Sequence, residues 1–81
     1  MSATTLTRSR EPFPVTIPGL RISPAAGGLW RVARPDGVVL GHIERAGESE
    51  PYRTRRLLPG GIRSMPLGEF WSPSDAADVF R

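Results

Sequence analysis

What this sequence lacks limits the kinds of protein it can be. It contains no cysteine and only one histidine. The absence of thiols excludes a disulfide scaffold, a thiolate zinc site and a cysteine nucleophile, and it fits the reducing cytoplasm, where we expect this chain to reside. Nothing in the sequence approaches the roughly 18 consecutive apolar residues of a membrane span. No apolar run follows Arg8 and Arg10 near the start, so a secretory signal is not expected either.

Lysine is missing as well, so all eleven basic residues are arginine and the 81-residue chain carries a net charge of +3. These charges lie in blocks. Residues 1–34 hold five arginines and one acid, residues 35–50 one arginine and four acids, residues 51–65 four arginines and no acid, and residues 66–81 one arginine and three acids. Such polarisation indicates surfaces that attract partners of opposite charge. The alternative explanation is the codon bias of a GC-rich genome.

The first 28 residues are expected to form a flexible, disordered arm. They contain four of the nine prolines, and proline at this density excludes a helix because each ring fixes φ and removes an N–H donor. Phe13, Val15 and Ile17 alternate with polar or proline residues, so residues 13–22 are a candidate for a short edge strand. The folded domain is expected to span residues 29–81.

Alternation of apolar and polar residues from Leu29 onward predicts strands. Residues 29–34 and 38–45 flank a Pro-Asp-Gly turn and predict a hairpin. "YRTRRL", residues 52–57, predicts a third strand. "IRSMPLGEFW", residues 62–71, is either a fourth strand or an extended arm. The predicted fold is therefore α+β, with a small three- to four-stranded antiparallel sheet.

The closing "SPSDAADVFR" predicts a short C-terminal helix that packs on one face of the sheet. Ser72 is suited to the N-cap, Pro73 to the first helical position and Asp75 to a capping box. Ala76, Val79 and Phe80 are spaced to form its buried face. The core is expected to consist of Trp30, Val32, Leu40, Ile43, Leu57, Phe70, Val79 and Phe80.

The sequence offers little that would support catalysis. His42 and Glu44 are two residues apart on one predicted strand, a spacing that also suits a solvent-facing pair. The remaining paired carboxylates fall in a loop and at the helix start, where they suit solvent and the helix dipole. Neither Gly-rich stretch precedes a helix with a phosphate-loop signature. We therefore expect that this protein is not an enzyme and that it binds neither a metal ion nor a cofactor.

The strongest functional signal is arginine. Arg53 and Arg55 share one face of the predicted third strand, roughly 7 Å apart, a spacing that suits successive phosphates of a nucleic-acid strand. Arg31 joins them only if the strands pair in the required register, which the sequence leaves open. The candidate nucleic-acid-binding residues are Arg8, Arg10, Arg31, Arg53, Arg55, Arg56 and Arg63.

Three segments also resemble a known family. "GLWRVARPDG", "YRTRR" and "LGEFWSPSDAADVF" are similar to the arm-type DNA-binding domains at the N-termini of phage tyrosine integrases, over residues 29–80. The resemblance implies a three-stranded sheet that packs on a C-terminal helix and enters the DNA major groove. The integrases continue into catalytic domains that have no counterpart in these 81 residues, so a non-catalytic module is expected. The chain is also similar to short arginine-rich proteins of high-GC actinobacteria, which implies no function.

Two hypotheses follow from the sequence. The first is a non-catalytic module that binds double-stranded nucleic acid, most naturally DNA, through arginines on the sheet. The second is a protein–protein interaction module or accessory subunit, in which the acidic residues 35–50, the "EFW" segment and the edge strands contact another chain. Two tryptophans in a chain with so small a core favour the second hypothesis, because tryptophan is enriched at interface hot spots. Neither hypothesis fixes an oligomeric state.

Overall fold

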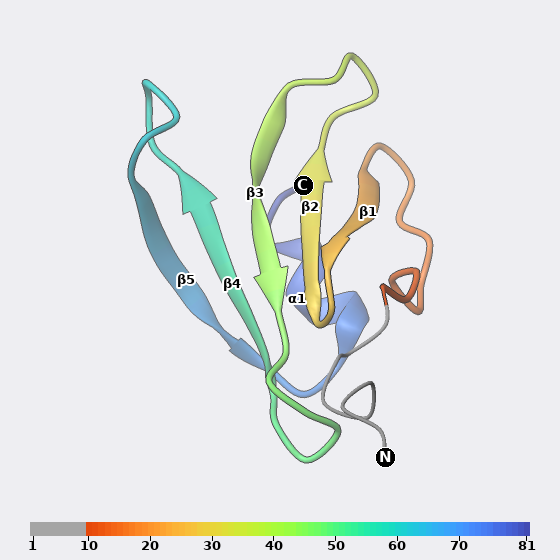
Figure 1. The fold of residues 1–81 in the computed structure, drawn as a ribbon. Coiled ribbons are helices and arrows are strands. Elements are labelled where there is room, and N and C mark those ends of the chain that lie inside the picture. Colours follow the sequence, from red (N-terminus) through yellow and green to blue (C-terminus); the bar gives the residue numbers. More distant parts are fainter. Residues whose placement is uncertain (1–9) are drawn as a thin grey trace, which may run out of the picture.

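The structure, a computed structural model, describes residues 10–81. In this part of the chain one antiparallel sheet is followed by a short helix (Figure 1). The elements are β1 (Arg21–Ala26), β2 (Leu29–Ala33), β3 (Val39–Glu44), β4 (Tyr52–Leu57), β5 (Ser64–Phe70) and α1 (Pro73–Asp78). The strand order is β1-β2-β3-β4-β5, so each strand pairs with its neighbours in sequence.

The α+β class and the C-terminal helix are confirmed, but the sheet has five strands and not three to four. The additional strand is β1, which begins at Arg21 and so shares only two residues with the candidate strand at 13–22. Both edge strands contain proline, Pro24 in β1 and Pro66 in β5. Proline is tolerated there because an edge strand has a neighbour on one side only.

The core lies between one face of the sheet and α1, which contacts β4 and β5. Trp30, Val32, Ile43 and Phe80 are buried as predicted, and Leu40 and Phe70 pack against them. Ala76 is buried as well, as the helical spacing predicted. The other buried side chains were not predicted: Phe13, Ile17, Tyr52, Thr54 and Ala77. Among residues 10–81, no element covers the opposite face of the sheet, which faces the viewer in Figure 1.

Residues 10–20, which belong to the predicted arm, pack on the core. The ring of Phe13 makes edge contacts with Trp30 and Tyr52, at centroid distances of 5.4 and 5.8 Å. The indole N–H of Trp30 donates a hydrogen bond of 2.7 Å to the carbonyl of Glu11. The folded unit therefore begins well before residue 29. Residues 1–9 of the predicted arm lie outside the described residues.

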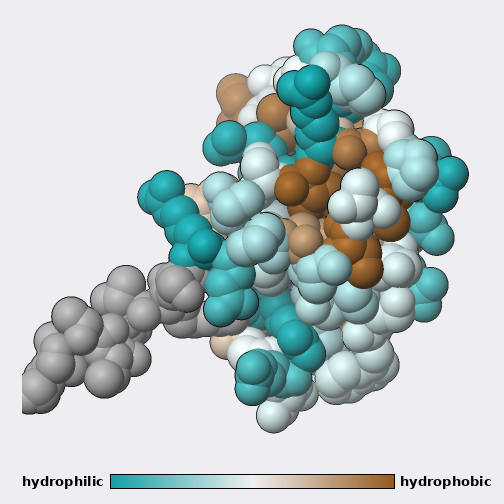
Figure 2. All heavy atoms as spheres, turned by 90° about the vertical axis from the view of Figure 1, so that its right-hand side faces the viewer, coloured by the Kyte–Doolittle hydropathy of each residue, from teal (hydrophilic) through white to brown (hydrophobic). Residues whose placement is uncertain are grey.

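This N-terminal side of the core is only partly closed. Figure 2 views the side of the molecule where β1 and the preceding segment lie, and shows a group of hydrophobic residues bordered by hydrophilic ones. Val15, Leu20 and Ile22, all from this region, are half-buried and pack against the core. The sheet thus keeps apolar surface near β1 that α1 does not cover.

Two β-bulges supply core residues that strict alternation would turn outward. Val32 pairs with Gly41 and Ala33 with Val39, so Leu40 is the additional residue of β3. In β5 the additional residue is Leu67, between the partners of Thr54 and Arg55. Both leucines pack against the buried cluster. A bulge places two residues opposite one, and here it adds an apolar side chain to the core each time.

The helix start is as predicted, but one helical core residue is not. Ser72 is the N-cap, and its hydroxyl accepts a hydrogen bond of 3.3 Å from the N–H of Asp75. Val79 was expected in the core, yet it is 37% exposed. The reason is the tight final turn, in which the N–H of Phe80 donates to the carbonyl of Ala77, three residues earlier. This turn buries Ala77 and Phe80 and leaves Val79 outside.

Candidate functional site

The strand register decides which arginines share a face. Arg31 of β2 pairs with His42 of β3, and His42 pairs with Arg55 of β4. In the same way Leu29, Glu44 and Arg53 form a neighbouring row across these strands. Paired residues of an antiparallel sheet project to the same side. Arg31, Arg53 and Arg55 therefore lie on one face.

This shared face is the one that α1 does not cover. Trp30 and Val32, on either side of Arg31 in β2, are buried in the core, whereas Arg31 is exposed. In β4, Tyr52 and Thr54 are buried, while Arg53 and Arg55 are exposed. The alternation thus directs the three arginines away from the helix and toward solvent.

A fourth arginine joins them from β1. Ile22 packs against the core, so its neighbour Arg21 projects to the uncovered side, where it pairs in register with Ala33. We call the uncovered side, with Arg21, Arg31, Arg53 and Arg55, the arginine face. The sequence prediction missed Arg21 because it did not predict that β1 begins there. The alternation of Arg21, Ile22 and Ser23 was the available signal.

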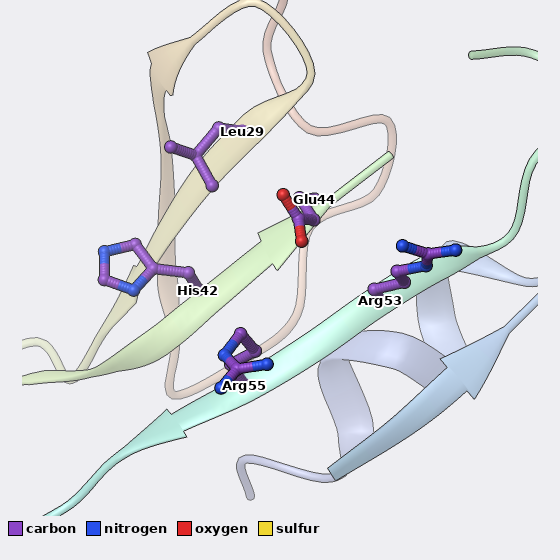
Figure 3. Close-up of a pocket in the computed structure, with 5 residues that line it drawn as sticks. All are labelled: Leu29, His42, Glu44, Arg53 and Arg55. Atoms are coloured by element: carbon purple, nitrogen blue, oxygen red, sulfur yellow. The ribbon is translucent and has the colours of Figure 1, made fainter. Parts of the chain in front are cut away.

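The centre of the arginine face is a shallow depression of about 210 Å³. Its lining consists of Leu29, His42, Glu44, Arg53 and Arg55, all on one side of β2, β3 and β4 (Figure 3). A second depression of about 320 Å³ adjoins it toward β5 and shares the side chains of Glu44, Arg53 and Arg55. The two depressions thus form a continuous open surface, in which both arginines, Arg53 and Arg55, come from β4.

The arginines of this face differ in how they are held. Arg53 Nε lies 3.3 Å from a carboxylate oxygen of Glu69. Arg55 donates through Nε to Ser64 Oγ at 2.9 Å, and through Nη2 to the Ser64 carbonyl at 3.3 Å. Within residues 10–81, Arg21 and Arg31 make no hydrogen bond or ion pair through their side chains. All of these contacts are exposed and therefore contribute little to stability.

Cations outnumber anions on the arginine face. Its four arginines face two carboxylates, Glu44 in β3 and Glu69 in β5. Glu69 is engaged by Arg53, and Glu44 lies between Leu29 and Arg53. The resulting excess of positive charge extends across the face from β1 to β4, which favours an anionic partner.

Three of the predicted binding residues, Arg10, Arg56 and Arg63, lie outside the arginine face as the strand register defines it. Arg56 pairs with Gly41 and lies on the helix side of the sheet, because alternation along β4 turns it away from Arg55. Arg63 lies in the loop between β4 and β5. Arg10 precedes Phe13, whose ring packs on the helix-side core. Arg8 lies outside the described residues.

His42 lies between Arg31 and Arg55 and close to Glu44, with no hydroxyl or thiol nucleophile among its cross-strand partners. Among residues 10–81, no group of three or more His, Asp or Glu side chains is placed to hold a metal ion. The same residues contain no helix with the length and hydrophobicity that a bilayer-spanning segment needs. The absence of an enzymatic activity remains a prediction.

Comparison with known proteins gives no further assignment, since no family model, curated protein or solved structure matches this chain. The resemblance to integrase arm domains implied three strands, whereas this sheet has five.

Proposed function

We propose that the arginine face binds double-stranded DNA without catalysing a reaction on it. The observation that supports this function is the register of β2, β3 and β4. It brings Arg31, Arg53 and Arg55 to one uncovered face, although Arg31 is more than twenty residues away in sequence. Guanidinium groups are planar, permanently charged and well suited to forked contacts with phosphate.

The shape of this face suits an extended polyanion more than a small ligand. Its depressions are open and shallow, and the one at its centre crosses β2, β3 and β4. Three strands spaced about 4.8 Å apart measure about 10 Å from the first to the third. This is comparable to the ~12 Å width of the B-DNA major groove.

The contacts of Arg53 and Arg55 hold these side chains in place but do not use all of their guanidinium N–H donors. Glu69 holds Arg53 by an exposed ion pair, and Ser64 holds Arg55 by two hydrogen bonds. Exposed ion pairs are worth about 0–1 kcal/mol, so a phosphate can replace Glu69 at small cost. The side chain of Arg31 has no partner among residues 10–81 that a phosphate would have to replace.

The test is the affinity of the purified protein for a duplex DNA oligonucleotide, measured by fluorescence anisotropy at several salt concentrations. Four phosphate contacts predict a log–log slope of about −3 to −4, since each contact contributes roughly −0.9. The double variant Arg31→Gln/Arg55→Gln should reduce the slope by about 2 and weaken binding at low salt.

Arg63→Gln is the matched control, since it removes the same charge from a loop outside the arginine face. It should leave the slope within experimental error of the unmodified protein. Undetectable duplex binding at low salt would overturn the proposal. The proposal would also be overturned if Arg63→Gln reduced the log–log salt slope as much as Arg31→Gln or Arg55→Gln does.

A second candidate function, a protein-interaction module, is favoured by one observation. Trp71, which follows the edge strand β5, is 71% exposed, and Met65 of the same strand is 43% exposed. Exposed tryptophan next to an unpaired strand edge is typical of a protein contact. Sedimentation of the pure protein tests this alternative: self-association that Trp71→Ser abolishes would support it, whereas a monomer at all concentrations would count against self-association.

A further inference from the structure

The helix side of the molecule has a second cluster of arginines, unrelated to the arginine face. Arg34 follows β2, Arg56 lies in β4 and Arg81 follows α1, and all three line one depression of about 380 Å³. Its apolar wall is formed by Leu20, Leu40 and Phe80. Four segments that are distant in sequence thus bring three guanidinium groups beside a hydrophobic surface.

A neighbouring depression of about 400 Å³ continues this site between two hairpin loops. It shares Leu40 and Arg56 with the first depression, so the two form one groove. Its lining is mainly apolar and includes Val38, Leu57 and Leu58. Val38, at this apolar end, is 47% exposed. The groove is therefore cationic at one end and apolar at the other.

At the cationic end, the guanidinium groups are only partly engaged by carboxylates, so N–H donors remain for an anion. Arg34 and Arg81 each make one exposed ion pair of 3.3 Å, with Asp36 and Asp78 respectively. The side chain of Arg56, which lines the same depression, makes no hydrogen bond or ion pair with any of residues 10–81. Among the side chains at this end, three guanidinium groups face two exposed carboxylates, beside an apolar wall.

We propose that this groove, defined by Arg34, Arg56, Arg81, Leu20, Leu40 and Phe80 together with the adjoining apolar stretch, binds a small amphipathic organic anion. Its carboxylate, phosphate or sulfonate group lies among the three guanidinium groups, and its aromatic or aliphatic part lies along Leu40 toward Val38. A guanidinium group binds such an oxyanion through two parallel N–H bonds. The groove volume is within the range of ligand-binding sites.

The probe for this site is 8-anilinonaphthalene-1-sulfonate, whose fluorescence rises in apolar surroundings, used with the folded full chain. N-phenyl-1-naphthylamine, which has the same rings without the sulfonate, is the matched neutral ligand. The sulfonate probe should bind more tightly than the neutral one. Arg56→Gln should weaken the sulfonate probe about tenfold, the effect of losing one charge-assisted hydrogen bond, and should leave the neutral probe unchanged.

Arg63→Gln serves as the charge-matched control and should leave both probes unaffected. Val38→Ser, at an exposed position of the apolar end, should weaken both probes alike. The proposal is overturned if the two probes bind equally, if Arg56→Gln and Arg63→Gln behave alike, or if Val38→Ser has no effect. Circular dichroism of each variant excludes probe binding to unfolded protein. Duplex DNA binding by Arg56→Gln should be unchanged, so this proposal and the proposed function can fail independently.

Discussion

The ring of Phe80 lies directly against the backbone of Gly41. A Cβ atom at Gly41 would be 2.7 Å from Cε1 of Phe80 and would also collide with the carbonyl oxygen of Arg55 in the paired strand. The C-terminal segment and the central strand can approach this closely only because residue 41 has no side chain. This contact packs Phe80, which follows α1, directly against the central strand β3.

Gly41→Ala is therefore expected to destabilise the fold by about 1–3 kcal/mol, the usual cost of overpacking a close contact. Urea denaturation followed by circular dichroism measures it. Gly47→Ala is the matched control, because a Cβ atom there meets nothing within 4 Å. Its free energy of unfolding should change by less than about 0.5 kcal/mol. Equal effects at the two positions would contradict the importance of the Phe80 contact.

Removal of the Phe13 ring should show that the N-terminal segment is part of the fold. Phe13→Ala removes two edge contacts, with Trp30 and Tyr52, and should cost about 3 kcal/mol. In a domain of this size such a loss is a large share of the total stability. Thermal unfolding checks it, with the exposed Pro14→Ala as control. Unchanged unfolding of Phe13→Ala would mean that residues 10–20 are dispensable.

Glu69→Gln should strengthen duplex DNA binding if the arginine face is the contact surface. The substitution removes the carboxylate that competes for Arg53 and adds one net positive charge to the face. The expected gain is about two- to fivefold at low salt, the worth of one exposed ion pair, and it should fade as salt rises. Fluorescence anisotropy with the same duplex measures it.

Asp78→Asn is the control for this gain. It makes the same charge change in a similarly exposed pair, with Arg81, that lies outside the arginine face. An equal increase for both variants would indicate a general charge effect and not a specific surface. An unchanged affinity for Glu69→Gln would argue that Arg53 does not contact DNA.

Asp36 should make stability depend on pH on the acid side. The N–H of Val38 donates to its carboxylate at 3.0 Å, and this bond, together with the nearby Arg34, lowers the pKa of Asp36 below its ordinary value. A lowered folded-state pKa adds stability above the unfolded pKa of about 3.9, and that stability is lost as pH falls through the folded pKa. Asp36→Asn keeps an acceptor oxygen but does not titrate.

The melting temperatures of the original protein and Asp36→Asn, measured between about pH 2 and 7, test this. The original protein should be the more stable above about pH 4, and its advantage should shrink as the solution becomes more acidic. A difference in melting temperature that does not change with pH would contradict the assignment.

The sequence predicted the central part of the fold well, because local patterns determine it. The hairpin around the Pro-Asp-Gly turn, the strand at 52–57 and the Ser72 cap all depend on residues close together in the chain. The burial of Trp30 and Val32 follows from simple alternation. For the same reason, the prediction that Arg53 and Arg55 share one face is confirmed.

The unpredicted features depend on contacts between distant residues. The alternation of Phe13, Val15 and Ile17 suggested a strand, but no local signal reveals that Phe13 packs on Trp30 and Tyr52. The bulge at Leu40 shifts the side-chain alternation by one residue, which only the paired strand β2 can determine. The position of Arg31 beside Arg55 likewise required the register of two strand pairs.

The strand order of the sheet also has a consequence for the rate of folding. Each strand pairs with the strand before it in sequence, and the intervening loops cover only residues 27–28, 34–38, 45–51 and 58–63. Closing such short loops costs little entropy, and topologies rich in local contacts fold quickly. We therefore expect the sheet to assemble hairpin by hairpin. The packing of residues 10–20 on Trp30 and of α1 on β4 then supplies the contacts that complete the core.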